Sequence, residues 1–117
     1  MTQHAALSAE RWAEFDIDQQ ILMIGNEMNR ASRFVAGGDP EGLRRGYERV
    51  LRLADLTAAG RPRRALLREL LRWRELVAGL YQSETLDAAL HRAAFRALLQ
   101  MTPTASRQIP YLVPRDR

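Results

Sequence analysis

Apolar residues recur every three or four positions in four separate stretches of this chain, and that period limits the folds open to it. In the first stretch, spacings of 4, 3, 4, 3 and 4 residues separate Ile17, Ile21, Ile24, Met28, Ala31 and Val35. Such spacing places these side chains on one side of an α-helix. The stretch is therefore predicted to be an amphipathic helix that buries one face.

Three further stretches show the same period. Their expected buried positions are Leu43, Tyr47, Val50 and Ala54, then Leu66, Leu70, Trp73, Val77 and Leu80, and finally Leu86, Leu90, Ala93 and Ala97, the last set flanked by Phe95, Leu98 and Met101. No stretch of useful length alternates between apolar and polar residues, as a half-buried strand would. The sequence thus predicts helices and no sheet.

Residues that favour helix ends separate the four stretches. We expect Asp18, Asp39 and Ser83 to cap the first, second and fourth helices at their N-termini, with Pro40 at the first position of the second. Glycine and proline interrupt the period at 36–40 and again at 57–62. Because the connections are short, neighbouring helices should run antiparallel.

The expected fold is all-α. Residues 1–101 should form an antiparallel four-helix bundle, with Trp12 and Phe15 in a short N-terminal helix over one end of the core. Residues 102–117 contain three of the five prolines and should not continue a helix. We expect an irregular tail, extended or disordered; the alternative is that its apolar segment "IPYLVP" docks as a strap on a neighbouring surface.

Composition narrows the class of protein. The chain is 46% hydrophobic and 27% charged, which is typical of a globular domain. It contains no cysteine, and this fits a reducing compartment. The first residues lack the pattern of a secretory signal, and no apolar run approaches the length of a membrane span. We expect a cytoplasmic protein.

The excess positive charge is concentrated in one stretch. The net charge is +4, and residues 61–75 hold six arginines and two glutamates, so they account for all of it. One stripe on the third helix, defined here as the arginine stripe, contains Arg61, Arg64, Arg68 and Arg72. Three interpretations fit such a stripe. It is a solvated face of the helix, a site for an anion or a nucleic acid, or a surface that pairs with acidic residues of a partner protein. The absence of lysine from the chain fits either a GC-rich genome or a use of the planar guanidinium.

The stretch "MIGNEMNRA" (23–31) is the most unusual helical stretch, because Asn26, Glu27, Asn29 and Arg30 lie at the border of its apolar face. Gly25 is unfavourable in a helix interior, which suggests close approach by another helix. A buried carboxylate requires a partner, and for Glu27 we expect an arginine of the third helix, especially Arg74. We therefore predict a structural polar cluster of Glu27, Arg30, Arg74 and Glu75, with a ligand site as the alternative.

Residues for catalysis or metal binding are scarce. His4 and His91 are the only histidines, and the paired Glu-x-x-His motifs of di-iron bundles do not occur. We expect His91 to lie at the surface or at its boundary. No serine has a histidine and an acid close to it in sequence, and the few glycines form no phosphate-binding loop. The prediction is a protein without catalytic residues, metal or cofactor.

Apolar residues also extend beyond a single stripe on two helices. The surplus residues are Leu22, Phe34, Leu67, Leu71 and Tyr81. A small bundle with such a surplus often covers it with a second copy. We expect a homo-oligomer, most simply a dimer with two-fold symmetry.

Several short motifs resemble a group of short bacterial and archaeal proteins that have no assigned activity. Their pattern is a tryptophan, a glutamine, Ile-Gly-x-Glu-x-x-Arg-Ala, then Asp-Leu-Thr, then Arg-Glu. The matching residues, spread over about 11–100, are Trp12, Gln19 or Gln20, Ile24, Gly25, Glu27, Arg30, Ala31, Asp55, Leu56, Thr57, Arg74 and Glu75. The resemblance implies a fold and no function.

The segment "IGNEMNR" is also similar to a helix of HEPN-type toxin ribonucleases. Those enzymes cleave RNA with an Arg-x4–6-His motif, and no histidine follows Arg74 at that distance. The favoured function is a non-enzymatic, self-associating interaction module. The alternative is an RNA-binding or toxin–antitoxin-type, nuclease-like protein that uses the arginine stripe.

Overall fold

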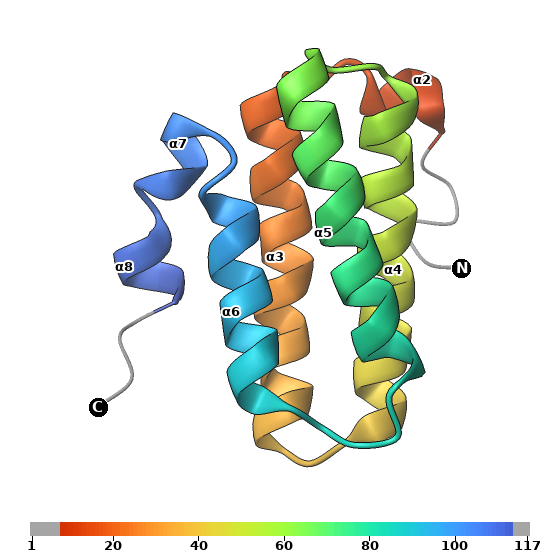
Figure 1. Cartoon of the computed structure of the whole chain (residues 1–117), viewed down its shortest axis with the longest axis vertical. Helices are drawn as coiled ribbons and strands as arrows, with labels where there is room; N and C mark the ends of the chain where they lie inside the picture. Colours follow the sequence, from red (N-terminus) through yellow and green to blue (C-terminus); the bar gives the residue numbers. More distant parts are fainter. Residues whose placement is uncertain (1–7, 114–117) are drawn as a thin grey trace.

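The computed structural model describes residues 8–113 (Figure 1). The four long helices are α3 (Ile17–Ala36), α4 (Pro40–Ala59), α5 (Arg64–Gln82) and α6 (Ala88–Leu99). Three short helices accompany them: α2 (Ala9–Trp12), α7 (Pro103–Ser106) and α8 (Ile109–Leu112). No strand occurs within these residues.

The long helices run alternately up and down and form a closed ring (Figure 1). Each packs against the next along the chain, and α6 returns to pack against α3. The all-α bundle predicted from the apolar period is therefore confirmed. None of the described helices has both the length and the apolar character needed to cross a lipid bilayer.

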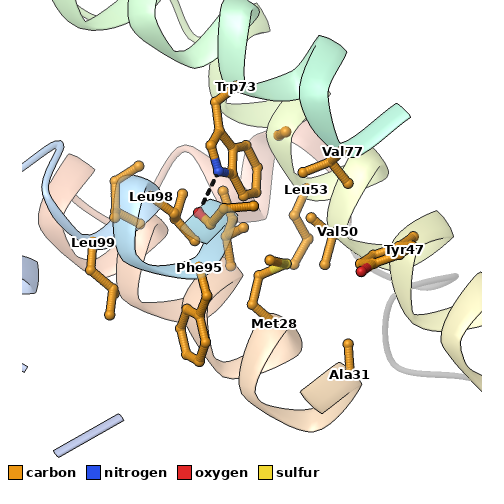
Figure 2. Packing of buried hydrophobic residues seen from close by; sticks show 14 of the residues in the cluster. Met28, Ala31, Tyr47, Val50, Leu53, Trp73, Val77, Phe95, Leu98 and Leu99 are labelled. Atoms are coloured by element: carbon orange, nitrogen blue, oxygen red, sulfur yellow. Dashed lines mark hydrogen bonds between the residues drawn. The ribbon is translucent and has the colours of Figure 1, made fainter. Parts of the chain in front are cut away.

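The core lies between the four long helices (Figure 2). Met28, Leu53 and Phe95 meet there from α3, α4 and α6, and each is almost fully buried. Trp73 enters from α5, and its indole Nε1–H donates to the Ala94 carbonyl oxygen at 2.7 Å. This bond fixes the level of α5 against α6. The buried positions expected in the first three helices are largely confirmed.

Helix α3 begins two residues earlier than a cap at Asp18 implies. Asp16 is the N-cap: its carboxylate accepts from the Gln19 backbone N–H at 2.8 Å, and the Gln19 side chain accepts from the Asp16 N–H at 2.9 Å. This reciprocal pair satisfies two donors that the helix leaves open. By contrast, Asp39 caps α4 as expected, with Pro40 at its first position.

The N-terminal turn closes one end of the core. Trp12, in α2, is buried, and its indole N–H donates to the Thr57 hydroxyl at 2.9 Å near the end of α4. The Gln20 side-chain amide donates to the carbonyls of Trp12 and Phe15. The expected short helix is present, but Phe15 follows it in the turn rather than belonging to it.

Helix α6 differs from the expectation in its start and in its buried face. Asp87, not Ser83, is the N-cap, while Ser83 ends α5 and bonds within a turn to Thr85. Leu90 and Ala93 are exposed. The buried residues are His91, Ala94, Phe95, Leu98 and Leu99. This face is bulkier, so its burial removes more apolar surface from water than the expected face would.

Residues 102–113 are folded, so the expected extended or disordered tail is wrong for this part. Thr102 caps α7, and Pro103 occupies its first position, where a missing N–H does no harm. Ala105 and Val113 are buried, and Arg96 of α6 donates to the Val113 carbonyl oxygen at 3.3 Å. The segment is the docked strap considered as the alternative. Residues 114–117 lie outside the described range.

Candidate functional site

A cavity of about 540 Å³ lies between α3, α6 and the end of α8. Its walls are apolar, with Phe95 and Val113 among them, and its polar residues include Ser32 and His91. The volume is within the range of small-molecule sites. The C-terminal strap passes beside α6 (Figure 1). Its residues Leu112 and Val113 form one wall of the cavity.

A chain of hydrogen bonds leads from this cavity into the core. Ser32 Oγ of α3 lies 2.9 Å from His91 Nε2 of α6. His91 Nδ1 in turn lies 2.7 Å from the Tyr47 hydroxyl of α4. Three of the four long helices therefore meet at one imidazole.

The partners of these groups assign their protons. Ser32 donates its hydroxyl proton to the Met28 carbonyl oxygen at 3.0 Å, one turn earlier in α3. The bond between Ser32 and His91 must then use an N–H from Nε2, and Nδ1 accepts from Tyr47. His91 is accordingly neutral, with its proton on Nε2.

The surroundings keep both rings neutral. Burial lowers the pKa of His91 below its usual value, the Met28 backbone opposes this, and the charge of Arg92 lowers it further. Burial raises the pKa of Tyr47 far above its usual value, and the negative charge of Asp87 adds to the rise. The chain of bonds thus retains one arrangement of protons near neutral pH.

This arrangement of protons does not activate Ser32 as a nucleophile. A serine nucleophile needs a base that accepts its proton. Here the Ser32 proton points to a backbone carbonyl, and the imidazole donates to Ser32 instead of accepting from it. Among residues 8–113, no three histidine or acidic side chains gather into a metal-ligand set.

The expected surface position of His91 is wrong. Its side chain is 3% exposed, because α6 buries the face that holds Phe95 and Leu98 rather than the face that holds Leu90. The sequence does contain Tyr47 at an expected core position, but only the packing of α4 against α6 shows that its hydroxyl meets a histidine.

The predicted polar cluster is divided between two places. Glu27 of α3 is buried and pairs with Arg49 Nε at 3.0 Å and with Arg30 Nη1 at 3.7 Å. Arg74 instead lies on α5 against Asp55 of α4, which its guanidinium contacts with two nitrogens. These bonds and the charge of Asp55 raise the pKa of Arg74. The prediction that Arg74 pairs with Glu27 is therefore wrong.

Glu75 remains beside Arg74, with its carboxylate 3.7 Å from Arg74 Nη1. Sequence reasoning missed Arg49 and Asp55. A signal for Arg49 exists: Gly42 and Gly46 precede it at spacings of seven and three, and both are buried. Glycines at helical spacing mark the side of α4 that approaches α3, and Arg49 borders that side.

The arginine stripe lies on the outer surface. Arg61, Arg64, Arg68 and Arg72 are all exposed. Within residues 8–113, none of them takes part in a hydrogen bond or ion pair with another side chain. Three of them belong to α5, and Arg61 precedes it.

Most residues of the predicted apolar surplus pack inside the single chain. Leu22, Phe34 and Tyr81 are partly buried and pack against the core, and Leu67 is also partly buried. Tyr81 further donates to Glu48 at 2.7 Å and stacks under Arg44. Among larger apolar residues of the described range, Leu71, Leu76, Leu90 and Tyr111 are exposed by 45%, 36%, 40% and 79%.

Compared with known proteins, the chain matches no family model, no curated protein and no solved structure.

Proposed function

We propose that this protein is a non-enzymatic helical-bundle module that self-associates as a two-fold dimer through a surface shared by α5 and α6. We define the α5–α6 surface as Leu76 with Leu90 and Ala93, all of which are exposed. The observation that carries the proposal is the exposure of Leu76 and Leu90, 36% and 40%, on adjacent helices.

The register of the two helices supports one continuous patch. The bond from Trp73 to Ala94 marks a common level of α5 and α6. The two helices run antiparallel (Figure 1). One turn forward from Trp73 on α5 therefore reaches Leu76, and one turn back from Ala94 on α6 reaches Leu90. Two exposed leucines at the same level on neighbouring helices form one apolar patch. Burial of such a patch against a second apolar surface is more favourable than its contact with water.

Charges at the rim of this surface also suit a symmetric contact. Glu69 and Arg72 lie on exposed positions of α5. In a two-fold dimer each surface meets its own copy, so groups of both signs allow pairing across the axis. The neutral, internally bonded Ser32–His91–Tyr47 chain supports the non-enzymatic part of the proposal.

The test is light scattering coupled to size exclusion at high micromolar concentration. Wild type should give the mass of two chains, and the double variant Leu76→Gln/Leu90→Gln the mass of one. The control Leu71→Gln/Tyr111→Gln removes two apolar groups that are more exposed, 45% and 79%, at other places on the surface, and should stay dimeric. A monomeric wild type, or a dimeric Leu76/Leu90 variant, contradicts the proposal.

A second function, binding of RNA or DNA, is favoured by a separate observation. All four arginines of the stripe are exposed and make no side-chain pair within the described residues, so their positive charges are available to phosphates. Such contacts release counterions, and affinity then falls steeply with salt.

Retention on heparin and on single-stranded RNA tests this second function. The variant Arg64→Ala/Arg68→Ala/Arg72→Ala should elute at lower salt, with a slope of log affinity against log salt reduced by about two to three. The control Arg33→Ala/Arg45→Ala/Arg107→Ala changes the net charge equally at exposed positions elsewhere. Equal elution of both triple variants would remove the support for nucleic-acid binding.

Two further proposals concern the cellular location and the family of the protein. We propose a cytoplasmic location, which the absence of cysteine supports and cell fractionation would test. Membership of the group with the Ile-Gly-x-Glu-x-x-Arg-Ala pattern is also proposed. Several residues of that pattern have structural roles here, since Trp12 bonds to Thr57 and Asp55 to Arg74.

A further inference from the structure

The cavity between α3, α6 and α8 has different groups at its two ends. The bond between Ser32 and His91 sets a common level of α3 and α6, which run antiparallel (Figure 1). From that level, Asn29 lies one turn away in one direction, and Val35 and Ala88 lie one turn away in the other. All five residues line the cavity. Its polar end at Asn29 and its apolar end at Val35 are therefore about 9 Å apart along α3.

The polar groups of the lining differ in whether their hydrogen bonds are already made. Ser32 and His91 bond to each other, and each bonds to a further group of the protein. By contrast, the side-chain amide of Asn29 makes no hydrogen bond within residues 8–113. Asn29 thus offers two N–H donors and a carbonyl acceptor to a ligand.

The lining favours an uncharged ligand. Ser32 and His91 are neutral, and none of the described lining residues is acidic, so a cationic head would find no counter-charge. Arg92 also lines the cavity, but it already has a partner in the protein, so an anionic head would have to compete for it. Burial of an unpaired charge costs far more than burial of a neutral group whose hydrogen bonds are made.

The apolar walls of the cavity belong to the fixed structure of the protein. Phe95 and Val113 are almost fully buried, and Val35 and Leu112 are partly buried and pack against the core. A hydrocarbon chain laid along these side chains would remove their remaining apolar surface from water. A ligand with one polar head and an aliphatic body matches such a lining.

We propose that this cavity binds one molecule of a neutral, medium-chain aliphatic amide, with its amide group paired to Asn29 and its hydrocarbon chain along Val35 towards Ala88. A primary amide is complementary to the Asn29 side chain, because each has N–H donors and a carbonyl acceptor and two bonds form side by side. The site goes beyond the proposed dimer and does not depend on it, since none of its described lining residues belongs to the α5–α6 surface.

Isothermal titration calorimetry of the full chain with octanamide tests the proposal. Octanamide should bind at one molecule per chain and with a negative heat-capacity change, the mark of apolar burial. Octanoate and octylamine have similar chains but charged heads, and each should bind about tenfold or more weakly because the charge would lose water. N,N-dimethyloctanamide stays neutral but has no N–H donor, and it should bind about three- to tenfold more weakly than octanamide.

One pair of variants tests the head of the site. Asn29 lines the cavity, whereas Asn26 is exposed on the same helix and does not line it. Asn29→Ala should weaken octanamide about three- to tenfold, the loss expected for about one hydrogen bond, while Asn26→Ala should bind as wild type does. Asn29→Ala should also narrow the difference between octanamide and N,N-dimethyloctanamide, which a change in stability alone would leave as it is.

A second pair tests the apolar end. Ala88 lines the cavity and its neighbour Ala89 does not, and both are exposed in the first turn of α6. Ala88→Phe should abolish octanamide binding by filling this end, while the control Ala89→Phe should bind as wild type does. Thermal unfolding shows that each variant is folded and gives a second readout, because octanamide raises the midpoint of every variant that binds it.

The proposal is overturned by any of four results. Two concern wild type, namely no saturable octanamide binding, or octanoate or octylamine binding as tightly as octanamide. The others are octanamide affinities of Asn29→Ala or of Ala88→Phe equal to that of wild type.

Discussion

His91 shows how one side chain connects distant parts of this chain. It lies on α6, accepts a hydrogen bond from Tyr47 of α4 and donates one to Ser32 of α3. A buried polar group stabilises a fold only when its bonds are satisfied. The single imidazole therefore helps to specify the relative positions of α3, α4 and α6. Apolar packing alone defines these positions less sharply, because it has no directional bonds.

Stability should decrease as the pH falls from about 7.5 to about 5, through the ordinary histidine pKa near 6.5. The pKa of His91 is lower in the folded state than in the unfolded chain, so unfolding takes up a proton in this range. The stabilisation that neutral His91 gives is complete above the pKa of histidine in the unfolded chain, and it is lost as the pH falls below that pKa. Its slope cannot exceed about 1.4 kcal/mol per pH unit for one proton.

Urea unfolding of wild type and His91→Gln across this range measures the effect. The variant should be less stable at pH about 7.5 but should show a flatter dependence on pH, since glutamine does not titrate. Parallel curves for the two proteins would show that His91 does not carry the linkage.

The Glu27–Arg49 pair leads to a second prediction at this scale. Glu27 is almost fully buried, whereas Arg49 keeps some contact with solvent. Arg49→Met should lower the free energy of unfolding by about 2 kcal/mol, because a buried carboxylate loses a close cation. The value is moderate because Arg30 stays within 3.7 Å of the carboxylate.

A double-mutant cycle with Glu27→Gln isolates the pair. Adding Glu27→Gln to Arg49→Met should recover part of the lost stability, since the unpaired negative charge is removed. Arg45→Met, on an exposed position of the same helix, should change stability by less than about 0.5 kcal/mol. Additive effects of the two changes would mean that they do not interact.

At the scale of the helix, two glycines in similar secondary structure should respond oppositely to alanine. A Cβ at Gly42 in α4 would lie 2.5 Å from Phe34 Cδ1 and 2.6 Å from the Asp39 carboxylate, so the contact between α3 and the start of α4 must shift. Nothing lies within 4 Å of a Cβ at Gly79 in α5. Gly79→Ala should therefore gain the higher helix propensity of alanine.

We expect Gly79→Ala to stabilise the protein by about 0.5–1 kcal/mol and Gly42→Ala to destabilise it by about 1–2 kcal/mol. Thermal or urea unfolding of the two variants side by side gives the signs. A stabilised Gly42→Ala would show that Phe34 and Asp39 move aside without loss.

The ends of the helices illustrate which local signals are decisive. Asp39 with Pro40 is a strong start, and α4 begins there. Asp16 and Asp18 both offer a carboxylate, but only Asp16 has a glutamine three residues later to return the bond. Ser83 and Asp87 are likewise both possible N-caps of α6. Asp87 is the cap, since its carboxylate accepts from the Leu90 N–H, whereas Ser83 accepts from the Thr85 N–H in the preceding turn. Where two caps stand close together, local chemistry leaves the choice open.

At the scale of the whole molecule, the C-terminal strap (102–113) packs against the bundle and adds buried residues to it. Ala105 is fully buried where α7 packs on α3, and Val113 is buried at the end of α8. A chain that ends at Met101 loses both contacts and one wall of the cavity. We expect its free energy of unfolding to be lower by about 2 kcal/mol or more.

Urea unfolding followed by circular dichroism measures this difference. The four long helices should remain, so the helical signal per residue should stay high while the midpoint falls. An unchanged midpoint would show that the strap adds nothing to stability.

The sequence predicted the fold better than the site. Ile24, Tyr47 and Trp73 stand in periodic seams, and the fold buries each of them. Glu27 was expected to need a cation, and it has one, but the partner is Arg49 on α4 instead of Arg74 on α5. Helical period specifies which face of a helix is buried, whereas the identity of a partner depends on the rotation and level of a second helix.

Periodicity by itself determined that four helices form, roughly where they begin and end, and that their apolar faces meet, because burial of apolar area needs no particular partner. Only the tertiary structure decided that α6 turns Phe95 inward and brings His91 to Tyr47, and that residues 102–113 return to wall a cavity. Two apolar faces were available on α6, and the choice between them depends on the shape of the groove left by α3, α4 and α5. The face of α6 that turns inward decides which hydrogen bonds and which cavity form, because both require several helices to lie within a few ångströms of one another.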